Sequence, residues 1–362
     1  VALSGNSLIV GAPGDDGSGN VSNGSGCLYL FTFADATFST ATLQGTIGQD
    51  YSGGKNYDLN ALDAGDAFGS AVTLEGTSMA AGAPFDDGLG NAYNNTGCLY
   101  TFTFADAVFS GATHQGILGR GYSAGKSLDV ATLEASDYFG SSISLNGTSL
   151  VVGTPGDDGF LNVAAQSGAV YFFTFSDAAF TLPVQQGMAG QDYTGGKNLD
   201  LNALEIGDQF GSSVSLDGTS LAVGAPSDDG AANTRTDAGA VYLFTFSDTA
   251  FSDVSLQGVI GYGYTGGKNY DLTALDNTDY FGGALALQST RLAVGAFGDD
   301  GSGNTRNGSG CVYTFTFADA TFTTSAIIAT SCTRRICAPR STARATAAAV
   351  PHSRRSTGRS TI

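Results

Sequence analysis

The chain has 362 residues, of which 42% are hydrophobic, a share that supports one or more buried cores. It contains 53 glycines, seven prolines and no tryptophan, a composition typical of tight turns between short strands rather than of long helices. The formal net charge is −18. Because this charge repels phosphate backbones, we do not expect the body of the protein to bind nucleic acid.

Positive charge is concentrated at the C-terminal end. Residues 330–362 hold seven of the 15 Lys and Arg residues and no acid, which leaves eight basic and 33 acidic residues in residues 1–329. We therefore divide the chain into a domain, 1–329, and a basic tail, 330–362, for which the composition predicts disorder. A basic interaction segment and an out-of-frame terminus are the alternatives for this tail. No apolar run approaches the roughly 18 to 20 residues of a membrane helix, which predicts no membrane span.

A 71-residue repeat organises the domain. In chain order, runs at 68–74 and 79–83 are joined by a Gly-Thr-Ser turn, which predicts a β-hairpin. A polar loop follows, and then an alternating run at 169–175 and its equivalents, which predicts a strand with Tyr171, Phe173 and Phe175 on one buried face. A more polar fourth run, such as 251–260, predicts an outer edge strand before a long loop returns to the next unit. Five units begin near residues 3, 74, 145, 216 and 287.

Four antiparallel strands in each of five repeats are typical of propeller blades, because one such sheet is too thin to bury both of its faces alone. The sequence thus predicts an all-β fold, a β-propeller of four-stranded antiparallel blades. The five repeats either form a ring of their own or belong to a larger propeller.

Two short motifs recur in register and carry a family resemblance. Phe-Gly pairs stand at 68–69, 139–140, 210–211 and 281–282, and Gly-Ala-Pro or a variant of it at 11–13, 82–84, 153–155, 224–226 and 295–297. The pattern resembles the FG-GAP repeat of integrin α-chain heads and of many bacterial surface proteins. The resemblance implies a β-propeller, an extracellular or cell-surface location, adhesion or ligand binding, and often calcium. The Asp-rich calcium loop of integrin-like repeats is missing here, because only residues 74–78 and their equivalents join the first two strands.

The polar loop after each Gly-Ala-Pro contains Asp-Asp-Gly-x-x-Asn. Carboxylate and amide oxygens suit calcium, which takes six to eight oxygen ligands. Alternatively, the aspartates cap the turn through hydrogen bonds to the backbone while glycine takes a positive φ. The candidate metal ligands are Asp15, Asp16, Asn20, Asp86, Asp87, Asn91, Asp157, Asp158, Asn162, Asp228, Asp229, Asn233, Asp299, Asp300 and Asn304.

The long return loop repeats Tyr-x-x-Gly-Lys, with an aspartate three residues after the lysine. A lysine repeated in an acidic background predicts an ion pair that pins the loop, with ligand binding as the alternative. In a propeller, this loop and the Asp-Asp loop are expected on one face, which is our candidate surface for a protein or glycan ligand. The lysines and aspartates are Lys55 and Asp58, Lys126 and Asp129, Lys197 and Asp200, and Lys268 and Asp271.

Cysteine and histidine give little support for catalysis. Cys27, Cys98 and Cys311 share a position at which other repeats have alanine, which predicts buried free thiols. The two histidines, His114 and His352, belong to no arrangement of Ser, His and Asp. Carboxylate pairs recur in every unit and are therefore interpreted as architectural. We predict no enzyme, with a propeller hydrolase or lyase as the least favoured alternative.

Taken together, the sequence predicts an extracellular or cell-surface binding or adhesion module that uses an acidic loop face. Calcium dependence is left open. The alternative from another class is a purely structural spacer within a larger surface protein. Loops that vary from repeat to repeat favour binding, whereas uniform loops favour a spacer.

Overall fold

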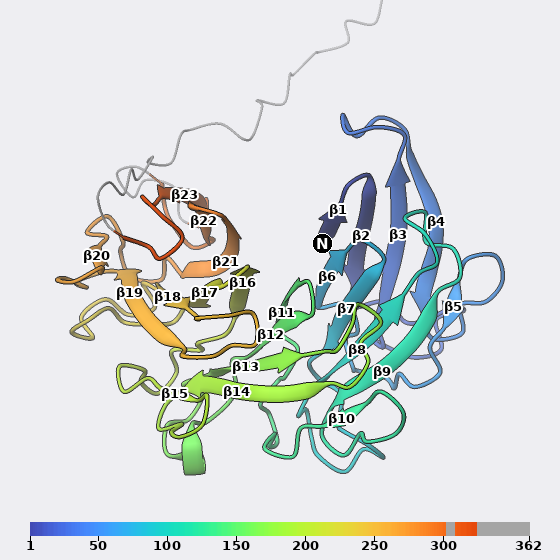
Figure 1. The fold of residues 1–362 in the computed structure, drawn as a ribbon, viewed down its shortest axis with the longest axis horizontal. Coiled ribbons are helices and arrows are strands. Elements are labelled where there is room, and N and C mark those ends of the chain that lie inside the picture. The colour runs from blue at the N-terminus through green and yellow to red at the C-terminus, as the bar shows by residue number, and fades with distance from the viewer. Residues whose placement is uncertain (302–307, 324–362) are drawn as a thin grey trace, which may run out of the picture. The chain divides into compact units, whose positions relative to one another are not determined.

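The computed structural model of the chain describes residues 1–301 and 308–323. The basic segment 330–362 lies outside the described residues. Within them, the chain forms five successive β-sheets, and its single helical element is a short 3-10 turn. Each sheet is one blade of a β-propeller (Figure 1), which confirms the predicted fold class.

The strands follow the repeat. Blades 1 to 4 each contain five strands and the described part of blade 5 contains three. Blade 1 comprises β1 (Ala2–Ser4), β2 (Ser7–Ala12), β3 (Cys27–Phe33), β4 (Ala41–Gly48) and β5 (Tyr57–Asp58); blade 2 comprises β6 (Ala71–Glu75), β7 (Ser78–Ala83), β8 (Cys98–Thr103), β9 (Thr113–Gly119) and β10 (Leu128–Asp129); blade 3 comprises β11 (Ser142–Asn146), β12 (Ser149–Thr154), the 3-10 turn η1 (Phe160–Asn162), β13 (Ala169–Thr174), β14 (Val184–Gly190) and β15 (Leu199–Asp200); blade 4 comprises β16 (Ser213–Asp217), β17 (Ser220–Ala225), β18 (Ala240–Thr245), β19 (Ser255–Gly261) and β20 (Tyr270–Asp271); blade 5 comprises β21 (Phe281–Gln288), β22 (Arg291–Ala296) and β23 (Cys311–Thr316).

Blades 1 to 4 contain one strand more than predicted. Their first four strands pair antiparallel as expected, but a two-residue strand from the return loop then pairs parallel with the fourth, as β15 does with β14. Side chains hold the loop there: Asn198 Oδ1 accepts a bond of 3.1 Å from the Met188 amide. The return loop thereby covers an edge whose amides and carbonyls would otherwise be unpaired.

Aromatic side chains of the third strand fill the space between blades. Tyr171 and Phe173 are fully buried and Phe175 is nearly so, which confirms the predicted buried face. They share one core cluster with Leu99 and Leu118 of the preceding blade. Burial of each such side chain stabilises the fold by roughly 1.5–3 kcal/mol.

The Phe-Gly pair of one blade lies against the Gly-Ala-Pro strand of the blade before it. The Phe210 amide donates to the Ser167 carbonyl across this boundary at 3.0 Å, and the Phe210 ring is fully buried. The backbones approach so closely that a Cβ built on Gly153 would lie 1.9 Å from the Gly211 oxygen. Gly211 itself has φ +92, a backbone conformation that favours glycine. Both motifs are therefore required by a single contact between blades.

Blades 1 and 5 each have one face that is more exposed than in the blades between them. Leu3 of β1 is 49% exposed, whereas the equivalent Leu74 is 8% exposed. Val312 of β23 is 53% exposed, whereas the equivalent Val241 is fully buried. Contact with a blade on either side thus accounts for the double-sided burial of blades 2 to 4.

The prediction that the repeated lysine pairs with a carboxylate is wrong. Lys126 Nζ donates instead to Gln115 Oε1 at 2.5 Å and to the Ala179 carbonyl of the next blade at 2.6 Å. Lys55, Lys197 and Lys268 bond to the equivalent glutamine and carbonyl. The lysine lies along the outer strand near the turn between the third and fourth strands, at the opposite end of the blade from the Asp-Asp loop. It therefore does not contribute to the candidate loop face.

The cysteine prediction is correct at two of three positions. Cys27 and Cys98 are buried free thiols, but Cys311 is disulfide-bonded. Burial, together with the nearby Asp15, raises the pKa of the Cys27 thiol to about 12. The Cys27 thiol is therefore neutral at ordinary pH and acts as a small core side chain.

The contact between blades predicts a large effect of a single methyl group. Gly153→Ala should lower the free energy of unfolding by about 1–3 kcal/mol or more, because the Gly211 backbone cannot move without separating the blades. Gly14→Ala is the matched control, since a Cβ there meets nothing within 4 Å. Denaturant midpoints of the two variants compare the positions directly. Equal midpoints would contradict this account.

Candidate functional site

The loop face is defined here as one end of the blades, formed by two kinds of segment. The first joins the second and third strands of a blade, and the second leads from one blade into the next. The joining loops are residues 13–26, 84–97, 155–168 and 226–239 with the described part of 297–310; the entry segments are residues 59–70, 130–141, 201–212 and 272–283.

The first aspartate of each Asp-Asp pair is held by hydrogen-bond donors. In blade 3, the Asp157 carboxylate accepts from the Gly159 amide at 2.9 Å and from the hydroxyl groups of Tyr171 and Tyr193 at 3.1 and 2.8 Å. Tyr171 comes from the third strand and Tyr193 from the return loop, so Asp157 joins three segments of its blade. Asp15, Asp86, Asp228 and Asp299 accept equivalent bonds from the amide two residues later and from one or two tyrosines.

The second aspartate closes the joining loop. Asp158 Oδ1 accepts from the Gln166 amide at 2.7 Å, eight residues later in the chain. This bond fixes the loop just before the third strand begins. Asp16, Asp87, Asp229 and Asp300 make the same bond with the amides of Gly24, Asn95, Asp237 and Gly308 at 2.6–2.8 Å.

The asparagine of the motif is directed away from the aspartates. Asn91 Nδ2 donates to Asp63 at 3.1 Å, and Asn162 and Asn233 donate to Glu134 and Glu205 in the equivalent entry segments. The backbone N–H of Asn20 donates to the Gly17 carbonyl, and the φ of Asn20 is +56. Asn304 lies outside the described residues. The Asp, Asp and Asn side chains therefore do not converge on one point.

These contacts bear on the metal hypothesis. Across residues 1–301 and 308–323, no three His, Cys, Asp or Glu side chains are grouped so that they could hold a metal ion. Since the first two aspartates accept bonds from amides and tyrosines, the geometry supports their turn-forming role. As arranged, the predicted ligands do not form a shared cation site, and calcium binding stays a prediction.

Sequence reasoning missed a second row of buried acids. Asp66, Asp137, Asp208 and Asp279 each stand two residues before a Phe-Gly pair and are 5% exposed. Asp137 Oδ2 accepts from the Glu134 amide at 2.7 Å and shapes the entry segment. Their recurrence at 71-residue spacing was the signal that could have revealed them.

The two rows of acids come close together at each blade boundary. Burial, and after it the charge of Asp157, raises the pKa of Asp137 to about 8, with smaller contributions from Glu134 and Asp158. The pKa of Asp208 is raised to about 8 and that of Asp66 to about 7, with burial the largest cause for both. Burial likewise raises the pKa of Asp279 to about 6. The loop face is therefore less negatively charged near neutral pH than its acid count indicates.

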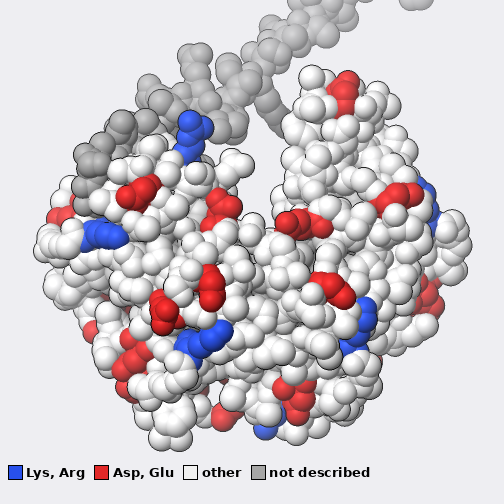
Figure 2. All heavy atoms as spheres, in the orientation of Figure 1, with Lys and Arg blue, Asp and Glu red and all other residues white. Residues whose placement is uncertain are grey.

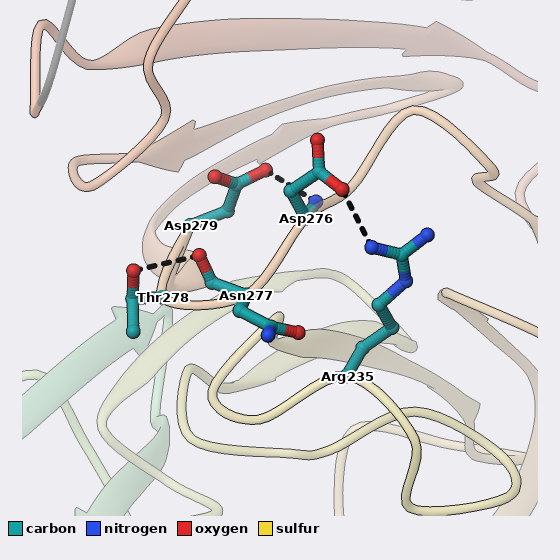
Figure 3. A network of polar contacts seen from close by, with 5 residues as sticks. All are labelled: Arg235, Asp276, Asn277, Thr278 and Asp279. Atoms are coloured by element: carbon teal, nitrogen blue, oxygen red, sulfur yellow. Dashed lines mark hydrogen bonds and ion pairs between the residues drawn. The ribbon is translucent and has the colours of Figure 1, made fainter. Parts of the chain in front are cut away.

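Arginine and tyrosine exchange places between two blades of the loop face. In blade 2, the Arg120 guanidinium lies 4.4 Å from the Tyr93 ring centroid. In blade 4, Arg235 lies 4.7 Å from the Tyr262 centroid. Arg235 stands at the repeat position of Tyr93, and Tyr262 stands at that of Arg120. Figure 3 shows Arg235 also bonded to Asp276 at 2.6 Å. The same cation–π contact is thus made twice with its partners reversed.

Charge is distributed unevenly over the molecule. Figure 2 shows Asp and Glu side chains over several blades of the face in view, with Lys and Arg at isolated positions.

The histidine in the described chain, His114, packs beside the rings of Tyr100 and Phe102, and burial lowers its pKa. Its surroundings are those of a core side chain.

Comparison with known families identifies the repeat. Residues 61–102, 133–173, 205–244 and 271–315 match the model described as FG-GAP repeat. These segments run from the entry segment through the third strand of blades 2 to 5. A search of curated proteins found no match.

The buried acids predict that stability falls as pH rises. Their pKa values in the folded state, about 6 to 8, exceed the unfolded value of about 4. The contribution of these acids to the free energy of unfolding is therefore fully present below pH of about 4 and is lost as the pH rises through the folded-state pKa values. Asp137→Asn mimics the protonated acid and should flatten this dependence, so that above pH of about 8 the variant is more stable than the native chain. Denaturant unfolding over this pH range measures the effect.

A control aspartate should behave in the opposite way. Asp177 is exposed, and bonds from Thr181 and then the Ala179 amide lower its pKa. Asp177→Asn should therefore cost stability near neutral pH rather than gain it. A pH dependence of Asp137→Asn as steep as that of the native chain would show that Asp137 ionises freely in the fold.

Proposed function

Because the chain belongs to the FG-GAP repeat proteins, whose propellers are binding modules in general terms, we propose that it is an extracellular or cell-surface ligand-binding or adhesion module that uses the loop face of blades 2 and 3. The observation that carries this proposal is the distribution of exposed hydrophobic side chains. Large hydrophobic groups exposed in a group on one surface mark interaction sites, whereas single ones are ordinary. The joining loops of blades 2 and 3, with the segment that enters blade 4, carry seven such side chains that are 38–76% exposed: Phe85, Leu89, Tyr93, Phe160, Leu161, Val163 and Ile206.

These side chains stand where the repeat varies. The position of Phe160 is serine in blade 1, leucine in blade 2 and alanine in blade 4. The bond that closes the loop is nevertheless the same, because the second aspartate accepts from the amide eight residues later in each of these blades. The scaffold therefore fixes the loops while individual blades present different side chains, an arrangement that suits recognition.

The spacer alternative accounts for a different part of the chain. The uniform Tyr-x-x-Gly-Lys segment makes the same contacts between blades wherever it is described. A spacer has no need for exposed aromatic and aliphatic groups on two neighbouring loops.

Among the described residues, no helix has the length and apolar character needed to cross a membrane.

Two matched leucines test the proposal. Leu161 on the loop face is 76% exposed with φ +64, and Leu182 at the opposite end of blade 3 is 70% exposed with φ +51. Arrays of glycans and extracellular-matrix proteins, probed with and without calcium, should yield a ligand whose affinity falls at least about tenfold, or about 1.4 kcal/mol, with Leu161→Asp. Leu182→Asp should leave it unchanged.

Both variants should melt like the native chain, since neither leucine is buried. Equal losses of affinity in the two variants would contradict a binding surface on the loop face. Arrays without a ligand would contradict the binding function and favour the spacer.

A further inference from the structure

A small pocket opens on the loop face of blade 3. It has a volume of about 130 Å³ and is lined by Tyr138, Pro155, Gly156, Gln166 and Gln209. Tyr138 comes from the segment that enters blade 3 and Gln209 from the segment that enters blade 4. The pocket therefore lies among three loops whose backbones are fixed by the blade contacts described above.

The pocket lies where blade 3 has a glycine in place of a ring, at a repeat position that is also glycine in blades 1 and 5 and serine in blade 4. In blade 2 the position of Gly156 is Phe85, whose ring packs edge-on against Tyr138 with centroids 5.5 Å apart. In blade 3 a Cβ on residue 156 would lie 2.0 Å from the Ser136 oxygen, so no side chain fits there. The space beside Gln209, which corresponds to the space beside Tyr138 in blade 2, is left open.

Two amide side chains line this space with their hydrogen-bonding capacity available. The backbone N–H of Gln209 donates to the backbone carbonyl of Gln166 at 3.1 Å, which fixes the two residues side by side. Within the described part of the chain, neither side-chain amide bonds to a protein group. Each offers one acceptor oxygen and two donor hydrogens to a ligand.

The pocket carries no formal charge of its own. None of its five lining residues is ionisable near neutral pH. The nearby carboxyl groups of Asp137 and Asp157 are buried and accept bonds from Glu134, Gly159 and tyrosines. An aromatic ring beside neutral donors and acceptors suits a ligand that is uncharged, rich in hydroxyl groups and flat on one side.

We propose that this pocket binds one neutral pyranose ring of a glycan, which lies against the Tyr138 ring and exchanges hydrogen bonds with the amides of Gln166 and Gln209. The volume suits a single sugar rather than a drug-sized ligand, since pockets for the latter measure about 300–1,000 Å³. This inference rests on the proposed binding function and gives it a ligand class. The exposed groups of the neighbouring loops would then contact the rest of the glycan.

Methyl glycosides of glucose, galactose and mannose, and N-acetylglucosamine, serve as probes in ligand-observed NMR titrations of the full chain. At least one should bind, and Gln209→Ala and Tyr138→Asn should each weaken it at least tenfold. Tyr138→Phe should bind like the native chain, because the hydroxyl of Tyr138 bonds to no described protein group. Asn95→Ala, at the position of Gln166 in blade 2, is the control that should change nothing.

Three outcomes would overturn the inference. The first is that no probe binds, and the second is that binding is equal in Gln209→Ala and the native chain. The third is that methylguanidinium binds in preference to the sugars, which would identify a cation pocket. If Leu161→Asp still abolishes binding of an array ligand in any of these cases, the proposed function stands and only the sugar pocket is lost.

Discussion

The close approach of backbones between blades is the constraint on which the rest of the structure depends. The Phe-Gly pair that enters one blade lies on the Gly-Ala-Pro strand of the blade before it, so close that even a methyl group on Gly153 would overlap the Gly211 backbone. The adjoining phenylalanine is buried and its amide bonds across the boundary. This contact fixes where each entry segment ends, and thereby the position of the acids and aromatic residues on the loop face.

A scaffold fixed in this way allows side chains to vary while the hydrogen bonds that close the loops are kept. The two aspartates of every joining loop bond to the same backbone amides, whether the neighbouring residue is Ser18, Leu89, Phe160 or Ala231. Exposed hydrophobic groups, the Arg–Tyr stacks and the pocket beside Gly156 all arise at such variable positions. The proposed binding function therefore follows from the differences among blades, and the fold follows from what they share.

The fold was largely predictable, because a repeat multiplies every signal: alternation at Tyr171, Phe173 and Phe175 recurs in all five units. The site was predictable only in part. The sequence pointed to the Asp-Asp-Asn motif, but it could not show that Asn162 is directed to Glu134 while Asp157 bonds to tyrosines, since these partners come from other segments. Lys126 was expected to pair with a carboxylate because composition shows which charges are present but not which groups lie close together in the fold. The acceptors that Lys126 bonds to are neutral. The pocket is lined by Gly156 together with Gln166 and Gln209, and no periodic pattern marks this combination, because the position of each glutamine holds that residue in one repeat alone.

Hydrogen exchange of the backbone amides that cross blade boundaries tests the central claim most directly. The amides of Phe68, Phe139, Phe210 and Phe281 donate to the preceding blade. If the contacts between blades hold the structure together, these amides should be as strongly protected as those of the central strands β7, β12 and β17, and should exchange in the same cooperative opening. Exchange as fast as that of the short edge strands β10, β15 and β20 would show that blades separate readily, which would contradict the account.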